Sequence, residues 1–334
     1  MNNLPSVSFV TCTFNSSKLI EECLSSIKSL DYPHHLIEIV IVDGGSTDGT
    51  LEIVKKFNCR IIEERTGRPE AATAIGYNEA NNDIIVNFPS DNIITSRDWL
   101  KRMVVPFILN PEISGAETCY YEYVRNDTLL NRYFSLFGAG DPIPYYLGKR
   151  DRITYFEQKK WPLKAKAVDK GDYYEVEFNE SNTPTVGANG FLIRKELAKL
   201  VSKTPLEFFH IDACLDLIKM GYNKYAFIKI GIWHKTGELF EPYLRRRLRY
   251  STIYFGDKAL RRYHTFDPKK DKLKLIIFVI LSFTFIEPLS ESIRGYLKIR
   301  DVAWFLHPIL CPIVALVYGY SLVKFKVGQL FKTI

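Results

Sequence analysis

The sequence has few cysteines and no pattern that would give them a role. Its six cysteines, at positions 12, 23, 59, 119, 214 and 311, are scattered and never form the C-x-x-C spacing of a zinc or redox site. A chain of 334 residues also has no need of a disulfide framework. These absences exclude a zinc-finger module and a disulfide-rich secreted protein.

A targeting segment and a Walker-type phosphate loop are missing as well. The N-terminus, MNNLPSVSF, has no basic start followed by an apolar core, so we predict no signal peptide and a cytoplasmic main domain. No glycine is followed by the Lys-Ser/Thr pair that a Walker loop needs. Any nucleotide phosphates would therefore have to be held in another way.

Positive charge is in only mild excess. Lys and Arg total 45 against 38 Asp and Glu, a net charge of +7. The excess gathers at residues 245–249, 261–262 and 269–272, directly before the most apolar part of the chain. Solubility alone does not need such clustering, so we favour attraction to anionic lipid headgroups or to phosphates.

Two long apolar runs lie near the C-terminus. Leu273–Leu289 is apolar apart from Lys274 and Glu287, and Val302–Val323 has no charged residue. The second run is long enough to cross a bilayer, and the first is borderline. We predict a C-terminal hairpin of membrane-associated helices that either spans the bilayer or inserts shallowly. A buried hairpin in a soluble protein is the alternative.

Short apolar runs alternate with amphipathic segments through the first hundred residues. Strands are predicted at 7–13, 37–42, 60–63 and 83–88, with helices at 16–30, 50–57 and 70–80 between them. This alternation is typical of an α/β fold with a mostly parallel, Rossmann-like sheet flanked by helices. We predict a catalytic domain at residues 1–250, in which the aromatic-rich stretch 138–175 forms a lid. A basic amphipathic linker and the apolar hairpin then fill residues 251–334.

Acidic residues follow two of the predicted strands. IVDGGSTDGT (Ile41–Thr50) ends a strand in Asp43 and turns on two glycines, whereas NFPSDN (Asn87–Asn92) ends another in the single carboxylate Asp91. Ligands of parallel sheets bind beyond the carboxyl ends of the strands, so both carboxylates are predicted at one site. Asp43 can accept hydrogen bonds from a base or a ribose but would repel phosphate. A plain strand–turn–helix with no ligand is the alternative.

Three segments together resemble a known family. VTCTFN (Val10–Asn15), VDGGSTDGT (Val42–Thr50) and the acidic strand end at Asp91 are similar to segments of the inverting family 2 glycosyltransferases, which have the GT-A fold. The resemblance extends weakly to about residue 250. It implies that these first loops bind the nucleoside of a sugar nucleotide through Thr11, Phe14, Asn15, Asp43 and Ser46.

The same resemblance implies a divalent cation, Mn²⁺ or Mg²⁺, at the diphosphate. The family's Asp-x-Asp reads Pro89-Ser90-Asp91 here, which leaves Asp91 as the one carboxylate ligand and Ser90 beside the nucleotide sugar. Such a cation often binds with one or two carboxylates, water and substrate phosphates. His234, in GIWHKTGE, occupies a position where these enzymes often carry a further ligand of the metal or the diphosphate.

Later segments match the family piece by piece. TVGANGFLIRKE (Thr185–Glu196) resembles the loop that borders the donor sugar, with Gly187 and Gly190 against it. HIDACLDLIKMGY, which begins at residue 210, resembles the helix start that carries the general base. The match implies Asp212 as the base, and Asp216 is a weaker candidate.

Two of these assignments keep alternatives. Ile211 stands where the family has the Glu of a Glu-Asp pair, and Asp212 could simply cap its helix. RRRLRY (Arg245–Tyr250) loosely resembles a signature of polymer-building members, which would place Arg246 and Arg249 on the diphosphate. A solvated helix face or a lipid-headgroup stripe is the alternative for these arginines.

The resulting hypothesis is a membrane-associated inverting glycosyltransferase. It would move a sugar from a nucleotide-diphosphate sugar to a lipid-linked or membrane-proximal acceptor, with membrane lipids as further partners and no nucleic acid. A polyprenyl-phosphate sugar synthase of the same family is one alternative. A catalytically inactive sugar-nucleotide-binding partner is another, because Pro89 and Ile211 replace acidic residues. A nucleotidyltransferase is disfavoured, since Val10–Asn15 lacks a glycine-rich phosphate loop.

Overall fold

The structure is a computed structural model that describes residues 4–158, 161–202, 208–235, 240–256, 261–265 and 270–330. It divides into two compact units. The first comprises Met1–Glu122 and Lys164–Lys235, and the second comprises Tyr123–Leu163 and Thr236–Ile334. This division differs from the expected boundary at residue 250, which falls inside helix α9 (Phe240–Gly256) of the second unit. The extent of the catalytic domain stays a prediction.

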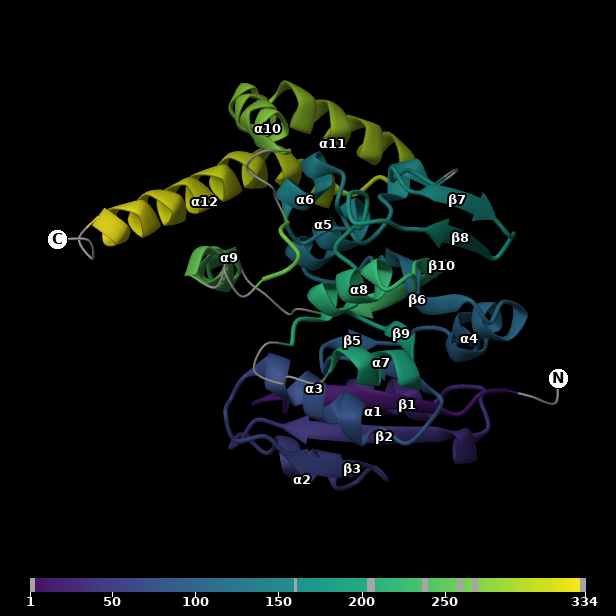
Figure 1. The fold of residues 1–334 in the computed structure, drawn as a ribbon. Helices are drawn as coiled ribbons and strands as arrows, with labels where there is room; N and C mark the ends of the chain where they lie inside the picture. Colours follow the sequence, from purple (N-terminus) through teal and green to yellow (C-terminus); the bar gives the residue numbers. More distant parts are fainter. Residues whose placement is uncertain are drawn as a thin grey trace. The chain divides into compact units, whose positions relative to one another are not determined.

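The N-terminal part of the first unit follows the predicted alternation (Figure 1). Its strands run parallel in the order β3-β2-β1-β4. Their central positions are buried β-branched residues, which pack well on a pleated sheet covered by helices. The elements are β1 (Val7–Thr13), α1 (Ile20–Lys28), β2 (Ile37–Asp43), α2 (Thr50–Val54), β3 (Arg60–Glu63), α3 (Pro69–Glu79) and β4 (Ile84–Asn87).

Beyond β4 the sheet becomes mixed and continues in the order β9-β6-β10-β8-β7. β9 is antiparallel to both neighbours because the chain re-enters the sheet at the carboxyl end of β4, where Gly190 N–H donates to Asn87 O at 2.8 Å. The β7–β8 turn is short, which requires an antiparallel pair. The elements are β5 (Asn92–Ile93), α4 (Trp99–Leu109), β6 (Ile113–Tyr121), β7 (Lys166–Asp169), β8 (Tyr173–Glu177), β9 (Phe191–Arg194), α7 (Lys195–Val201), α8 (His210–Lys219) and β10 (Lys224–His234).

The second unit is helical and has an aromatic core. The ring of Phe137 stacks on His307 with centroids 4.0 Å apart and meets the ring of Trp304 edge-on at 4.9 Å. The predicted lid is not one irregular segment, since it supplies α6 and a short 3₁₀ helix to this unit and β7 and β8 to the sheet. The helices are α5 (Leu129–Phe137), α6 (Pro142–Leu147), a 3₁₀ turn (Tyr155–Glu157), α9, α10 (Lys272–Thr284), α11 (Ile286–Lys298), a second 3₁₀ turn (Val302–Leu306) and α12 (His307–Leu330).

The first predicted apolar run is broken in the structure. α10 and α11 meet at Phe285, which has φ +59°, and the two helices are bent by 74°. Within the described residues, the segment Val302–Gly328 is long and apolar enough to cross a membrane, and the bent pair would count as a second span only if taken together. Length and composition of this kind are weak evidence, because core helices of soluble proteins share them.

Candidate functional site

The loops after β1 and β2 are tied together by reciprocal hydrogen bonds. The backbone N–H of Asn15 donates to Ser46 Oγ at 2.9 Å, and the N–H of Thr47 donates to Asn15 Oδ1 at 2.9 Å. Asn15 has φ +48°, a left-handed conformation that asparagine tolerates better than most residues. The structure therefore brings Asn15 and Ser46, both predicted nucleoside-binding residues, to one point on the carboxyl edge of the sheet.

Asp43 organises the turn that follows it. Its Oδ2 accepts the N–H groups of Gly45 and Ser46, each at 2.9 Å, and its Oδ1 accepts the hydroxyl of Ser46 at 2.5 Å. The residue is only 1% exposed. Gly45 has φ +90°, where a side chain would be strained. The carboxylate thus holds the shape of the loop, and direct contact with a base or ribose stays a prediction.

Thr11 and Phe14 differ in their access to solvent. Phe14 is 62% exposed directly after β1, so its ring is available for stacking against a flat ligand. Thr11 is fully buried within β1 and lies beneath the loops instead of lining their surface. The predicted part of Thr11 in nucleoside binding stays a prediction.

The predicted metal ligands Asp91 and His234 are neighbours. His234 Nε2 lies 3.2 Å from Asp91 Oδ2, and Lys235 N–H donates to Asp91 O at 2.8 Å. The pairing of β5 with the end of β10 sets this contact, because His234 lies opposite Asn92. Ser90, one residue earlier, has its Oγ 3.0 Å from Ser16 Oγ, which links this strand end to the loop after β1.

Two residues at this edge were not identified from the sequence. Asn87, the last residue of β4, donates from Nδ2 to Gly187 O at 2.9 Å and accepts from Gly190 N–H at 2.8 Å, so it holds both ends of the glycine loop. Tyr121, the last residue of β6, has its ring centroid 5.6 Å from that of His234, and its hydroxyl accepts from Asn189 Nδ2 at 3.0 Å. Both residues end buried strands, which is the only signal that the sequence offers for them.

The two glycines of this loop are required by its conformation. Gly187 and Gly190 have φ of +107° and +81°. A Cβ added to Gly190 would lie 2.5 Å from Ile232 Cδ1, and one added to Gly187 would lie 3.1 Å from Cys214 Sγ on α8. The loop is therefore packed closely between the sheet and the start of α8.

Asp212 lies in the first turn of α8 and is fully buried. Phe209, not Asp212, is the N-cap residue of this helix, which removes the simple capping alternative. The sequence predicted that Asp212 faces the cleft, but in the structure its side chain has no solvent-accessible surface. A Cβ added to Gly187 would lie 3.2 Å from His210 O, so the glycine loop packs against the start of the helix that carries Asp212.

Arg246 and Arg249 lie on α9, in the second unit. On the same helix, Arg247 Nη1 lies 3.3 Å from Oδ2 of the buried Asp141. The predicted role of Arg246 and Arg249 at the diphosphate stays a prediction. An open groove of about 460 Å³ in the first unit contains none of the predicted site residues; it is lined by Leu109, Asn110, Glu112, Lys170, Tyr173, Glu175 and Lys224.

Comparison with known proteins matches the N-terminal part of this site to a protein family. Residues 8–170 match the model of glycosyl transferase family 2. The chain carries a glycosyl transferase family 2 domain. The match includes the loops of Asn15, Asp43 and Asp91, so the resemblance drawn from the three motifs is confirmed.

Relatives of this family 2 domain include two archaeal enzymes. The chain is 30% identical over 109 residues to glycosyltransferase AglE of Haloferax volcanii, covering 31% of this chain and 36% of that protein. It is 31% identical over 105 residues to a dolichyl N-acetyl-α-D-glucosaminyl phosphate 3-β-D-2,3-diacetamido-2,3-dideoxy-β-D-glucuronosyltransferase of Methanococcus voltae, covering 29% of this chain and 32% of that protein. The matched parts are thus about a third of each relative's length.

The fold of the family 2 domain has a solved counterpart. The mannosyltransferase PcManGT from Pyrobaculum calidifontis, solved with GDP-mannose and Mn²⁺, aligns with a TM-score of 0.53 at 16% identity, covering 96% of this chain and 88% of that one. At this identity the likeness concerns the fold alone. The predicted α/β architecture is confirmed.

The donor set at Asp91 suits a divalent cation that binds together with its substrate. Among the residues that the structure describes, no group of three or more His, Cys, Asp or Glu side chains assembles a metal site. Asp91 and His234 supply one carboxylate and one imidazole, and Mn²⁺ accepts both kinds of ligand. Such a pair leaves the other coordination positions to water and to phosphate oxygens, as is usual for nucleotide-bound cations.

Proposed function

We propose that this protein is an inverting glycosyltransferase that moves a sugar from a nucleotide-diphosphate sugar to a lipid-linked acceptor at a membrane surface. The observation that carries the proposal is the meeting of Asp91 and His234, 3.2 Å apart, on the sheet edge that also holds the Asn15–Ser46 loops. The family 2 match covers the loops of this edge up to Asp91. The named acceptor of the Methanococcus voltae relative supports a lipid-linked substrate for this chain.

The β1 and β2 loops would bind the nucleoside. Phe14 offers an exposed ring for the base, and the Asn15–Ser46 hydrogen bonds hold the loop in place before the donor arrives. A loop that is ordered in advance loses less entropy on binding. Asp43 acts here as a positioning residue, because it fixes Gly45 and Ser46 through three accepted hydrogen bonds.

Asp91 and His234 would hold the divalent cation, which when bound neutralises charge on the leaving diphosphate. Tyr121 keeps the imidazole in place by ring contact. The backbone of Gly187 and Gly190 would lie against the sugar, in a loop that Asn87 fixes at both ends. Asp212 would take the proton of the acceptor hydroxyl as that oxygen attacks the anomeric carbon from the face opposite the diphosphate. Because the side chain is buried in this structure, this role requires the start of α8 to shift and expose Asp212 when the substrates bind.

The test of the base is Asp212→Asn, with Asp216→Asn on the same helix as the matched control. Loss of a general base lowers turnover by about two to four orders of magnitude, whereas donor affinity should stay within about twofold. Asp216→Asn should leave both unchanged. Loss of donor binding together with turnover in Asp212→Asn would remove the assignment.

The test of the donor site is a thermal-shift series with UDP, GDP, dTDP and CMP, each with and without Mn²⁺. A nucleotide that binds only the folded state raises the melting temperature. One nucleotide should stabilise the protein more than the others, and Mn²⁺ should increase its effect. Mild acid treatment of the product then separates a sugar phosphodiester, the product of a polyprenyl-phosphate sugar synthase, from a glycoside. Nucleotide binding without turnover across acceptors would instead identify an inactive binding partner.

A further inference from the structure

The second unit exposes a continuous apolar surface along α10. Six large aliphatic or aromatic side chains of this helix are between 43% and 68% exposed: Leu273, Ile276, Ile277, Val279, Ile280 and Phe283. Only Phe278 and Ser282 of the helix are buried against the rest of the unit. A water-exposed surface of this size and composition marks an interaction site. We call these six residues the α10 face.

α11 has three distinct faces around its axis. Residues spaced three or four apart share one side of a helix. The buried face is Pro288, Glu291, Ser292 and Gly295, whereas the exposed side divides into an apolar stripe and a polar stripe that run the length of the helix. The apolar stripe is Ile286, Leu289, Ile293 and Leu297, and the polar stripe is Glu287, Ser290, Arg294 and Lys298. A helix with both stripes suits a position at a lipid–water boundary, where each stripe meets its own medium.

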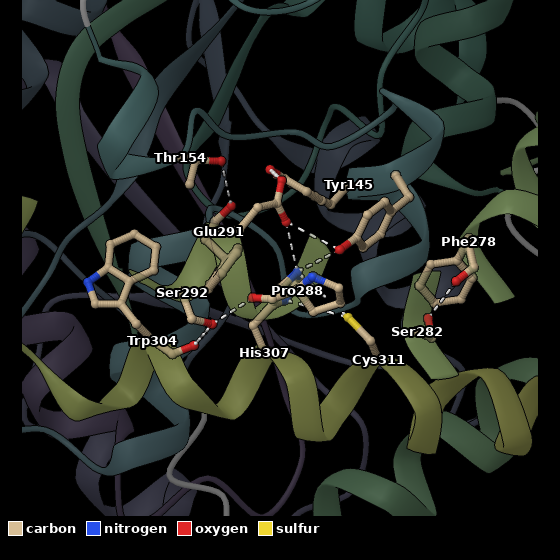
Figure 2. A network of polar contacts seen from close by, with 12 residues as sticks. Tyr145, Thr154, Phe278, Ser282, Pro288, Glu291, Ser292, Trp304, His307 and Cys311 are labelled. Atoms are coloured by element: carbon tan, nitrogen blue, oxygen red, sulfur yellow. Dashed lines mark hydrogen bonds and ion pairs between the residues drawn. The ribbon is translucent and has the colours of Figure 1, made fainter. Parts of the chain in front are cut away.

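Buried polar contacts hold α11 and α12 in this arrangement. Figure 2 shows Tyr145 and His307 meeting at the carboxylate of Glu291, with His307 Nε2 at 3.1 Å from Glu291 Oε2. Ser292 Oγ also donates to Trp304 O at 2.7 Å. Opening the bent pair into straight spans would carry Glu291 into hydrocarbon without these partners, which is strongly unfavourable.

Helix length excludes spanning by α10 or α11 alone. Each helix has 13 residues, about 20 Å at 1.5 Å per residue, against a hydrocarbon core of about 30 Å. The 74° bend at Phe285 prevents the two from adding their lengths in one direction.

α12 is long enough to span but packs against the arginine-rich α9, which lies beside it in Figure 1. Ser321 Oγ lies 2.6 Å from Ser251 Oγ, and Tyr318 donates to Asp141 Oδ2, the carboxylate paired with Arg247. If α12 crossed a bilayer, Ser251 and Arg247 of α9 and Asp141 beside α6 would lie inside the hydrocarbon with it. Charged side chains there are expensive, so α12 is not expected to cross.

From these contacts we infer that α10 and α11 embed in a single leaflet, in the plane of an anionic membrane, and that α12 does not cross it, so that none of the described helices of this unit spans the bilayer. We expect these apolar surfaces to contact a lipid bilayer, because exposed basic residues lie on α10, α11 and α12 or closely follow α11. These are Lys272, Arg294, Lys298, Arg300, Lys324 and Lys326. Basic residues beside inserted apolar ones bind anionic headgroups. The inference rests on the proposed function for its membrane setting and adds the mode of insertion.

Vesicle flotation of the full chain tests the binding surface. Vesicles of phosphatidylcholine with phosphatidylglycerol should bind the protein more tightly than phosphatidylcholine alone. Ile276→Ser with Ile280→Ser should weaken binding about tenfold or more, because two side chains no longer enter the hydrocarbon. The matched control is Ile108→Ser with Leu109→Ser, two comparably exposed apolar residues of the first unit, and it should bind as the unchanged protein does. Equal binding by the α10 double variant would overturn the inference.

Chemical labelling tests the insertion mode. Arg300→Cys and Lys326→Cys place a thiol at exposed positions before α12 and near its end. When the protein is bound to vesicles from outside, a membrane-impermeant maleimide should label both thiols without detergent, above the background of the unchanged chain. Protection of one site until detergent is added means that α12 spans, and refutes the inference.

The remaining outcomes separate this inference from the proposed function. A protein that stays unbound by vesicles and forms a dimer of defined size uses the α10 face against a second copy, which also overturns the inference. Donor turnover, measured in detergent with a soluble acceptor, reports on the proposed function alone. Turnover without vesicle binding therefore rejects only the insertion mode, and vesicle binding without turnover rejects only the transferase.

Discussion

The two ends of β2 offer a sharp comparison between a carboxylate that shapes the site and one that only stabilises the fold. Asp43 ends the strand and holds the Gly45–Ser46 turn, whereas Glu38 lies near its start. Glu38 accepts from Asn81 N and Asn81 Nδ2 at 2.9 and 2.8 Å and pairs with Arg60 at 3.1 Å. Five residues of extended strand separate the two carboxylates by about 16 Å. Asp43→Asn and Glu38→Gln therefore make a matched pair.

The magnitude follows from the hydrogen bonds at Asp43. Its carboxylate accepts three, and a bond to a charged group contributes about 1.5–3 kcal/mol against about 0.5–1.5 for a neutral one. An asparagine keeps one acceptor oxygen and loses the charge, so we expect about 1–3 kcal/mol less stability. The lost hydrogen bonds fix the Gly45–Ser46 turn, which belongs to the loop that would hold the nucleoside. Donor affinity should therefore drop about tenfold to a hundredfold.

Glu38→Gln should lower stability by a similar amount without weakening the donor. Chemical denaturation gives the stability of both variants, and nucleotide titration by calorimetry gives the affinity. If Asp43→Asn binds the nucleotide as tightly as Glu38→Gln does, the positioning role of Asp43 is wrong. If Glu38→Gln also loses affinity, the effect is a general loss of stability instead of a local one.

Glu38 also predicts a pH dependence with a definite sign. Burial alone would raise the pKa of Glu38, but hydrogen bonds from Ser8 and Asn81 and the charge of Arg60 outweigh it and hold that pKa below the ordinary value. A carboxyl group whose pKa is lowered on folding stabilises the protein at any pH above its unfolded pKa of about 4.3. This stabilisation disappears as the pH falls through the folded pKa. Below pH 5, the free energy of unfolding should therefore decrease less with falling pH for Glu38→Gln than for the unchanged protein. Equal acid sensitivity would contradict the assignment.

Three further predictions concern the cation, the glycine loop and the helical unit. Asp91→Asn and His234→Gln should each raise the Mn²⁺ concentration needed for half-maximal turnover about tenfold or more, and unchanged metal titrations would remove both from the cation site. Gly190→Ala, at φ +81° and 2.5 Å from Ile232 Cδ1, should lose about 1–3 kcal/mol in denaturation, whereas Gly140→Ala, which meets no atom within 4 Å, should not. Glu291→Gln should destabilise the protein by about 1–3 kcal/mol because it weakens the contact with His307, whereas the exposed Glu287→Gln on the same helix should be neutral. Equal thermal unfolding of the two Glu variants would show that the buried contact contributes nothing.

Local sequence was sufficient for the N-terminal half of the sheet and its loops. Continuous β-branched runs define β1 and β2, and the two glycines after Asp43 permit the turn that the structure has there. These features depend on neighbours within a few residues, which the sequence displays directly. The family resemblance could be drawn from them for the same reason.

Tertiary structure decided which distant residues meet. Asp91 and His234 are 143 positions apart and come together only because β5 pairs with the end of β10. The reversed direction of β9 depends on where the chain re-enters the sheet, and the break at Phe285 turned a predicted continuous run into two helices with different faces. The pairing of Arg247 with Asp141 depends on the rotation of α9 about its axis. None of these follows from local periodicity, because each is fixed by packing between segments that the sequence keeps far apart.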